Sequence, residues 1–125
     1  MTKREYKLAL YDLLNQDVDD LDIFEKLNET RKILVEYQKD NENQFDLSNK
    51  GHTWQDEELE IILSAAPTKE NCARFARLFK RGYGSIEQIY RWAASSSKEI
   101  EDKGRDQDAF IQQIKKVVKK IGFRA

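Results

Sequence analysis

The sequence contains few of the residues on which several common folds and sites depend. Its 125 residues include one Cys, one His, one Pro and five Gly. A single Cys excludes a disulfide within the chain, and one Cys with one His supply too few ligands for an ordinary zinc site. So few Gly and Pro also disfavour a β-sandwich or barrel, which needs many tight turns. We therefore expect no metal, no cofactor and no β-rich fold.

Long apolar runs are also missing. No run approaches the roughly 20 residues that a membrane span requires. The charged residues 1–6 do not lead into the apolar core of a signal peptide. We therefore expect no membrane partner and a cytoplasmic protein, associated with the nucleoid or, in a eukaryote, located in the nucleus. Six Phe, five Tyr and two Trp at regular apolar spacing argue against a disordered chain.

Apolar residues recur at helical spacing in six segments, which predicts an all-α fold. The expected helices cover about 3–15, 21–39, 53–66, 69–81, 86–95 and 108–121. Asp20 is placed to cap the second helix, Gly82 to end the fourth in the left-handed conformation, and Ser85 with Gln88 to cap the fifth. We expect an acidic N-terminal helical hairpin (1–45), a helix-turn-helix core (53–95) and a basic C-terminal helix (98–125), packed as one compact body.

The first helix of the core carries two apolar stripes on different sides. Leu59, Ile62, Leu63 and Ala66 form one stripe, and the other contains Trp54, Ile61 and Ala65. Because a helix with two apolar stripes needs two layers of neighbours, we expect the hairpin or the C-terminal helix to pack on Trp54 and Ile61. The remaining predicted core positions are Cys72, Phe75, Ala76, Phe79, Ile86, Ile89, Tyr90, Ala93, Phe110, Ile114, Val117 and Ile121.

The net charge of −1 conceals an uneven distribution along the chain. Residues 1–65 carry 8 basic and 16 acidic side chains, a net charge of −8, whereas residues 66–125 carry 14 basic and 7 acidic ones, a net charge of +7. This difference suggests two surfaces with different partners, of which the basic one suits a polyanion. Uneven solvation of two helical layers explains the same numbers.

Three short helices with a Gly-rich turn between the second and third have the layout of a helix-turn-helix. On the second of these helices, Arg74, Arg77 and Arg81 share the face away from the core, with Lys80 beside them. Such a row suits the phosphates of a DNA strand, although it is equally typical of a solvated face. On the third helix, Gln88 and Arg91 lie opposite the apolar positions and have the chemistry to bond adenine and guanine.

A Trp that opens a helix, paired acids and downstream aliphatic residues precede this helix-turn-helix. The residues that carry the pattern are Trp54, Asp56, Glu57, Glu58, Ile62 and Leu63, followed by 76–81 and 85–93. The arrangement resembles a Myb/SANT repeat over residues 53–95. The resemblance implies a homeodomain-like DNA binder whose third helix reads bases through Ser85, Gln88 and Arg91, or, as in the SANT branch, a binder of protein tails.

The last predicted helix carries a basic flank beside its apolar stripe, formed by Lys115, Lys116, Lys119 and Lys120. These lysines, with Arg124 in the tail, either supply further phosphate contacts or form the solvated surface of a packed helix. The full set of expected DNA-binding residues is Arg74, Arg77, Lys80, Arg81, Ser85, Gln88, Arg91, Lys115 and Lys119.

No motif with catalytic spacing is present, so we expect no enzyme. The leading hypothesis is binding of double-stranded DNA by a transcriptional regulator or by a DNA-binding factor of a phage or mobile element. The alternative is a protein-binding adaptor or inhibitor that acts through the acidic N-terminal half, by mimicking a nucleic acid. Homodimerisation through the hairpin or the C-terminal helix would help a single small reading head to reach useful affinity.

Overall fold

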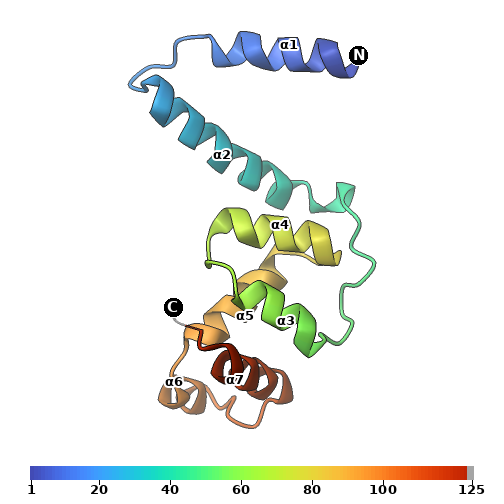
Figure 1. Ribbon diagram of the computed structural model, residues 1–125, viewed down its shortest axis with the longest axis vertical. Coiled ribbons are helices and arrows are strands. Elements are labelled where there is room, and N and C mark those ends of the chain that lie inside the picture. Colours follow the sequence, from blue (N-terminus) through green and yellow to red (C-terminus); the bar gives the residue numbers. More distant parts are fainter. Residues whose placement is uncertain (124–125) are drawn as a thin grey trace. The chain divides into compact units, whose positions relative to one another are not determined.

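The computed structural model describes residues 1–123, and its regular elements are all helices (Figure 1), which confirms the all-α prediction. In chain order they are α1 (Lys3–Leu14), α2 (Ile23–Asp40), the short 3₁₀ helix η1 (Glu42–Gln44), α3 (Asp56–Leu63), α4 (Lys69–Phe79), α5 (Tyr83–Ala94), α6 (Ser97–Asp102) and α7 (Ala109–Ile121). Arg124, predicted from the sequence to contact phosphate, lies outside the described residues.

The chain divides into two units, Met1–Glu36 and Tyr37–Ala125, here called the N-terminal unit and the C-terminal unit. The division falls inside α2, whereas the sequence places the end of the hairpin at residue 45. The N-terminal unit carries six basic and nine acidic side chains, and the C-terminal unit carries 16 and 14. The charge contrast across residue 65 therefore separates α3 from α4 within one unit, and does not separate two bodies.

In the N-terminal unit, α1 and α2 meet at a turn and then diverge (Figure 1). The ammonium of Lys26 fixes the turn by donating hydrogen bonds to the carbonyl oxygens of Leu14, at 2.7 Å, and Gln16, at 2.6 Å. Asp20 does not cap α2, because it adopts a positive φ of 66° within the turn. Asp22 takes that role, and its carboxylate accepts a hydrogen bond of 2.8 Å from the backbone N–H of Glu25.

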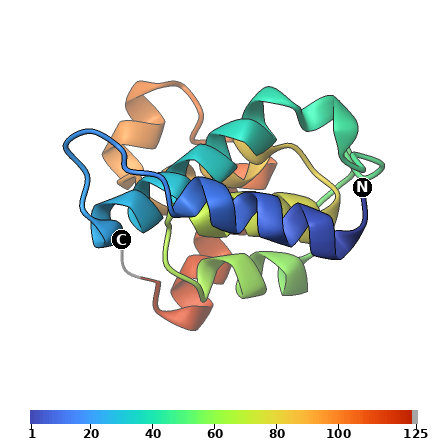
Figure 2. The same cartoon turned by 90° about the horizontal axis from the view of Figure 1, so that it is seen from above.

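The C-terminal unit buries one apolar core among α3, α4, α5 and α7. Leu59, Ile62, Ile86, Ile89 and Ile114 are completely inaccessible to solvent. Figures 1 and 2 show α7 beside α3, and α7 also packs against α5. The core faces predicted for α4 and α5 are confirmed at Cys72, Phe75, Ala76, Ile86, Ile89, Tyr90 and Ala93, all of which are buried. The expectation that the C-terminal helix covers the core is therefore correct.

The second apolar stripe predicted for the first helix of the core is buried only in part. Trp54 is buried and packs edge-on against Phe79, with ring centroids 5.7 Å apart. Ile61, by contrast, leaves 51% of its surface exposed, so the prediction that a second layer covers it is wrong. The reason is that α7 approaches α3 on its acidic side, where Asp56 and Glu60 form contacts with lysines of α7.

The connection between α4 and α5 also differs from the prediction. Lys80, not Gly82, adopts the left-handed conformation that ends α4, with φ 57° and ψ 48°. Because the chain turns two residues earlier than expected, α5 begins at Tyr83 and Ser85 lies within its first turn instead of capping it. The turn keeps the three-residue length of a helix-turn-helix, and Gly82 precedes α5 in extended conformation.

The first turn of α5 is capped by a residue that lies far away in the sequence, in the segment after α2. The Glu42 carboxylate, in η1, accepts a hydrogen bond of 2.6 Å from the backbone N–H of Tyr83. A carboxylate in this place satisfies an unpaired helical N–H and interacts favourably with the helix dipole.

We expect Glu42→Ala to lower the free energy of unfolding by about 1 kcal/mol, because the N–H of Tyr83 loses its acceptor. Urea unfolding monitored by circular dichroism measures this change. Glu57→Ala is the matched control, since Glu57 is an exposed acid at the start of α3. Equal stabilities of the two variants would show that Glu42 does not cap α5.

Candidate nucleic-acid interface

The outer face of α5 is the most accessible part of the predicted interface. Gln88 and Arg91 are exposed, and neither side chain forms a hydrogen bond or ion pair with another described residue. Ser85 is half-buried on the same helix. The opposite face anchors α5 firmly, because the Tyr90 hydroxyl donates a hydrogen bond of 2.6 Å to the carbonyl oxygen of Ile62 in α3. The helix is therefore held by its apolar side and presents its polar side to solvent.

The exposed face of α4 retains two of the predicted arginines. The Arg74 guanidinium lies 5.0 Å from the ring centroid of Phe75. Arg77 donates a hydrogen bond to the side-chain oxygen of Gln38, and Gln38 in turn donates one of 2.9 Å to the carbonyl oxygen of Ala73. Both guanidiniums stay exposed, and neither has an acidic partner among the described residues. Lys80 is also exposed but lies 3.7 Å from the Asp46 carboxylate.

Arg81 does not belong to the interface, which corrects the predicted row of three arginines. Only 5% of its surface is exposed. Its guanidinium lies 3.8 Å from the centre of the Trp54 ring and donates hydrogen bonds to the carbonyl oxygens of His52 and Thr53. The prediction that Arg81 points outward assumed that the helix continues to residue 81. Instead, the left-handed Lys80 ends α4 and turns the next side chain inward.

Burial also affects the electrostatics of Arg81. Removal from water lowers the pKa of its guanidinium, and the negative charge of Glu58 partly opposes this effect. The Nε atom is buried without a hydrogen-bond partner among the described residues. Arg81 therefore joins the 52–54 segment to the end of α4 as a structural cation.

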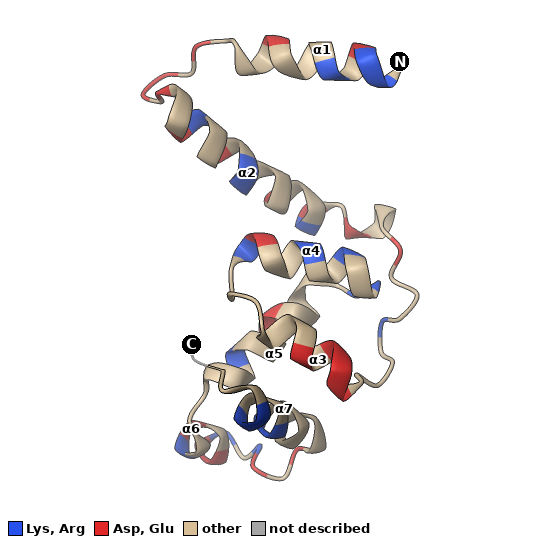
Figure 3. Cartoon of the chain, in the orientation of Figure 1, with Lys and Arg blue, Asp and Glu red and all other residues tan. Residues whose placement is uncertain are grey.

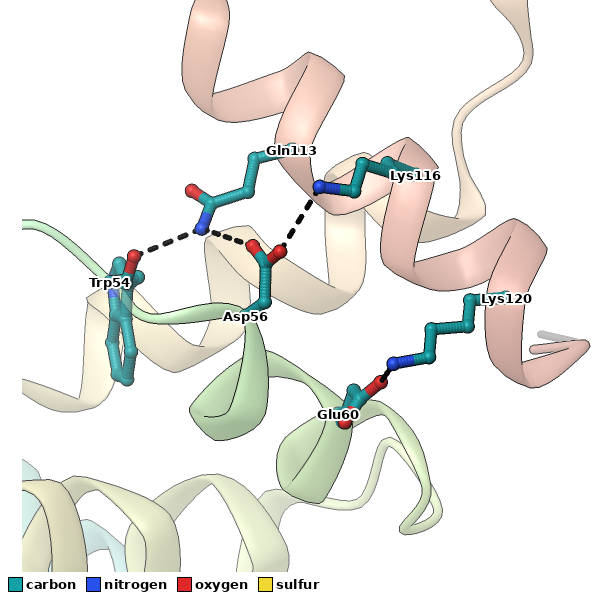
Figure 4. A network of polar contacts seen from close by, with 6 residues as sticks. All are labelled: Trp54, Asp56, Glu60, Gln113, Lys116 and Lys120. Carbon is teal, nitrogen blue, oxygen red and sulfur yellow. Dashed lines mark hydrogen bonds and ion pairs between the residues drawn. The ribbon is translucent and has the colours of Figure 1, made fainter.

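Two of the four lysines on the basic flank of α7 pair with acids of α3 (Figure 4), and Figure 3 shows this basic helix and the acidic start of α3 by colour. Lys116 lies 3.1 Å from the Asp56 carboxylate, and Lys120 pairs with Glu60. Gln113 donates further hydrogen bonds to Asp56, at 2.8 Å, and to the carbonyl oxygen of Trp54, at 2.9 Å. The acids at the start of α3 thus hold α7 in place, and they account for part of the charge contrast in the sequence.

The pKa shifts in this network agree with its geometry. Hydrogen bonds from Gln113 and then Lys116 lower the pKa of Asp56, and the hydrogen bond to Glu60 raises the pKa of Lys120. Each shift favours the charged form of its group. These groups are largely exposed, so we assign the network a positioning role and only a small electrostatic contribution to stability.

The two α7 lysines in the predicted interface have different surroundings. Lys115 is half-buried and donates hydrogen bonds to the carbonyl oxygens of Ala93, at 3.0 Å, and Ser95. It therefore satisfies the C-terminal carbonyls of α5, where a cation is favourable, and is not available to phosphate. Burial lowers the pKa of its ammonium. Lys119 is exposed and has no ion-pair partner among the described residues.

The structure adds a feature that sequence reasoning missed. The segment 98–108, for which the sequence predicts no helix, contains most of α6. It places Lys103 and Arg105 at 5.4 and 5.5 Å from the ring centre of the half-buried Trp92. Ser96 and Glu99 form a capping box at the start of α6. The Ser-x-x-Glu spacing at 96–99 was the signal that could have revealed this helix.

Three predicted residues, Gln88, Arg91 and Lys119, remain exposed without a contact to another described side chain. Arg74, Arg77 and Lys80 are also exposed, and they contact Phe75, Gln38 and Asp46 respectively. Over residues 1–123, no group of three or more Cys, His, Asp and Glu side chains is arranged to hold a metal ion. Within the same residues, no helix has the length and apolar character needed to cross a membrane.

Comparisons with known proteins cover nearly the whole chain. The profile of a family described as the uncharacterised protein PM1205 C-terminal domain matches residues 48–125. The chain is 46% identical over 126 residues to the uncharacterized protein PM1205 of Pasteurella multocida (strain Pm70), covering 99% of each sequence. No solved structure matches the chain. The similarity therefore includes both structural units.

Proposed function

This chain belongs to the PM1205 C-terminal domain family, and we propose that it acts by binding double-stranded DNA through its C-terminal unit, without catalysis. The observation that carries the proposal is the outer face of α5, where Gln88 and Arg91 are exposed and unpartnered among the described residues. These two side-chain types have the hydrogen-bonding groups that match adenine and guanine in the major groove.

Two further observations support this assignment. A three-residue turn connects α4 to α5, as in a helix-turn-helix, and α3 packs against α5 from the other side. Arg74 and Arg77 are exposed on α4 without an acidic partner among the described residues, so they are available to phosphate. The proposed interface therefore combines contacts of α5 with bases and contacts of α4 with the DNA phosphates. The protein would bind DNA in the cytoplasm at the nucleoid or, in a eukaryote, in the nucleus.

We expect Arg91→Ala and Arg74→Ala to weaken DNA binding in different ways. Losing Arg91 reduces the preference for the best site over random duplex by about tenfold, because a bidentate base contact is removed. Losing Arg74 weakens binding to all sequences and lowers the slope of log K against log salt by about 0.9, as expected for one phosphate contact. Fluorescence anisotropy with a selected site and a random duplex, at several salt concentrations, measures both effects.

Lys98→Ala is the matched control for these variants, because Lys98 is an exposed cation on α6 away from the proposed contacts. Its affinity and salt dependence should equal those of the unchanged protein. Absence of duplex binding at low salt would overturn the proposal. Identical effects of Arg74→Ala and Lys98→Ala would show that binding reflects general charge and not this interface.

The acidic N-terminal half gains less support as a nucleic-acid mimic. Two of its acids, Asp56 and Glu60, pair with α7 lysines, so they do not contribute to an open anionic surface. Counted by unit, the N-terminal unit has a net charge of only −3. Beside its charged side chains, this unit exposes large apolar ones, such as Tyr6, Leu13 and Leu34, and an apolar surface of this kind favours a protein partner.

A further inference from the structure

The N-terminal unit leaves an unusual amount of apolar surface exposed. No residue of α1 is buried anywhere along its described length. Tyr6, Leu10 and Leu13 expose 58%, 41% and 66% of their surfaces, and in α2 Ile23 and Leu34 expose 63% and 64%. Isolated apolar residues on a surface need no explanation, but a contiguous group of this size marks an interaction site.

Part of this apolar surface forms one stripe on each helix, although both helices also expose apolar side chains on other faces, such as Leu8 and Phe24. In α1, Tyr6, Leu10 and Leu13 follow one another at intervals of four and three residues, which places them on one face. In α2, Ile23, Leu27 and Leu34 share one face at the same four–three alternation, with the half-buried Thr30 between the last two. This alternation is the spacing that helices use when they pack lengthwise against other helices.

The helices also need such packing to be stable. A 12-residue helix such as α1 is marginal in water without tertiary contacts. The two helices of the unit diverge from their turn, so they do not cover each other's stripes (Figure 1). The exposed parts of the apolar side chains on the two stripes amount to on the order of 600 Å² per copy, at the lower end of the roughly 600–1,000 Å² per partner that standard stable interfaces bury.

The distribution of charge along α1 identifies a partner that fits. Lys3, Arg4 and Lys7 make the start of α1 basic, whereas Asp17 and Asp19 follow directly after its end. When two copies of α1 run antiparallel, the basic start of each lies beside the acidic turn of the other. The same arrangement places the two Tyr6–Leu10–Leu13 stripes face to face, over a helix about 18 Å long.

We infer that the N-terminal unit forms a homodimer, in which α1 packs antiparallel against α1 of a second copy and the apolar stripe of α2 completes the interface. A two-fold arrangement is self-complementary, because each basic segment meets one acidic segment at both ends of the helix pair. The inference is independent of DNA binding, since it involves residues of the N-terminal unit only.

Sedimentation equilibrium of the full chain over a wide concentration range tests the association. The unchanged protein is expected to be a dimer. Leu10→Asp combined with Leu13→Asp should weaken the dimer at least 100-fold, because two charges enter the apolar interface. Leu8→Asp is the matched control, since Leu8 lies on the opposite side of α1 and is 54% exposed. Near-ultraviolet circular dichroism shows whether the C-terminal unit stays folded in each variant.

A charge exchange tests the antiparallel arrangement. In one variant, Lys3 and Lys7, which flank the stripe of α1, become Glu; in the other, Asp17 and Asp19 become Lys. Each variant alone places like charges together and should dimerise at least tenfold more weakly. When the two variants are mixed, both pairs of charges become complementary, so a heterodimer should form with the affinity of the unchanged protein. Asp20 and Asp22 are left unchanged because they shape the turn and cap α2.

Three results would overturn the inference. A monomer at all concentrations would show that the apolar stripe does not bind a second copy of the chain. A dimer that survives the Leu10 and Leu13 substitutions would place the interface elsewhere. A dimer that depends on the stripe but gains nothing from mixing the two charge variants would exclude antiparallel α1 pairing. None of these results affects the DNA-binding measurements, which depend on variants of the C-terminal unit.

Discussion

Replacing Arg81 with Ala is expected to lower the free energy of unfolding of the C-terminal unit by about 3 kcal/mol, a large part of the total for a small domain. The loss has two sources. The guanidinium donates hydrogen bonds to the carbonyl oxygens of His52 and Thr53, which would lose their partner. It also covers the ring of the buried Trp54 at 3.8 Å, where a desolvated cation–π contact contributes about 2 kcal/mol.

Two further variants separate these contributions. Arg81→Met keeps most of the apolar side chain but removes the donors and the charge, so it should recover part of the stability. Arg74→Ala removes an exposed guanidinium from the same region and should change the stability by less than about 0.5 kcal/mol. Thermal unfolding followed by Trp fluorescence measures all three, and Arg81→Ala should lower the melting temperature by about 15 °C.

The result also distinguishes the two interpretations of this residue. The sequence pattern places Arg81 in an exposed row with Arg74 and Arg77, where its removal would weaken DNA binding and leave the fold intact. The structure places it under the segment before α3, where its removal weakens the fold. If Arg81→Ala were as stable as Arg74→Ala, the buried position would be wrong.

Six of the seven α-helices in residues 1–123 were predictable, because apolar spacing depends only on local sequence. The buried faces of α4 and α5 follow from their 3.6-residue period, and so does the exposure of Gln88 and Arg91. The orientation of Arg81 was not predictable in this way. It depends on a single left-handed residue, Lys80, which carries no Gly or Asn signature.

The partners of charged side chains were also beyond the sequence pattern. Lys115, Lys116 and Lys120 look like a solvated or phosphate-binding flank until the fold brings α5 and α3 against them. Glu42 caps a helix that begins 41 residues later in the chain. Such contacts join segments far apart in sequence, so helical periodicity contains no information about them. Contacts of this kind also explain why two predicted residues do not belong to the interface: Arg81 contacts the 52–54 segment and Lys115 contacts the end of α5.

A second large effect is expected at alkaline pH, where the C-terminal unit should unfold as three buried acidic groups ionise. Burial raises the pKa of Tyr83 and of Tyr90 from 10.0 to about 12, and it raises the pKa of the Cys72 thiol from 9.0 to about 11. The negative charge of Glu87 adds to the shifts of Cys72 and Tyr83. All three side chains are less than 9% exposed, so their charged forms would lack water.

The direction of the effect follows from the number of protons that each state binds. Below about pH 9, both the native and the unfolded chain keep these protons, and the full stabilisation is present. Above that pH, the unfolded chain loses them first, so it binds fewer protons than the native state and the free energy of unfolding falls as pH rises. The loss continues until the native groups ionise, at about 11 for Cys72 and about 12 for the tyrosines.

Tyr83→Phe provides the sharpest test, because it removes one titrating group while keeping the buried ring. We expect this variant to lose stability less steeply than the unchanged protein between about pH 10 and 12. Tyr90→Phe should show the same shallower dependence, together with a loss of about 1 kcal/mol at neutral pH, because its hydroxyl donates a hydrogen bond to the carbonyl oxygen of Ile62. Urea unfolding at a series of pH values measures both slopes, with Tyr11→Phe, at an exposed position of α1 away from its apolar stripe, as the control. If Tyr83→Phe and Tyr11→Phe followed the same pH dependence, the Tyr83 hydroxyl would be in contact with water, and α5 could not pack on α4 as described.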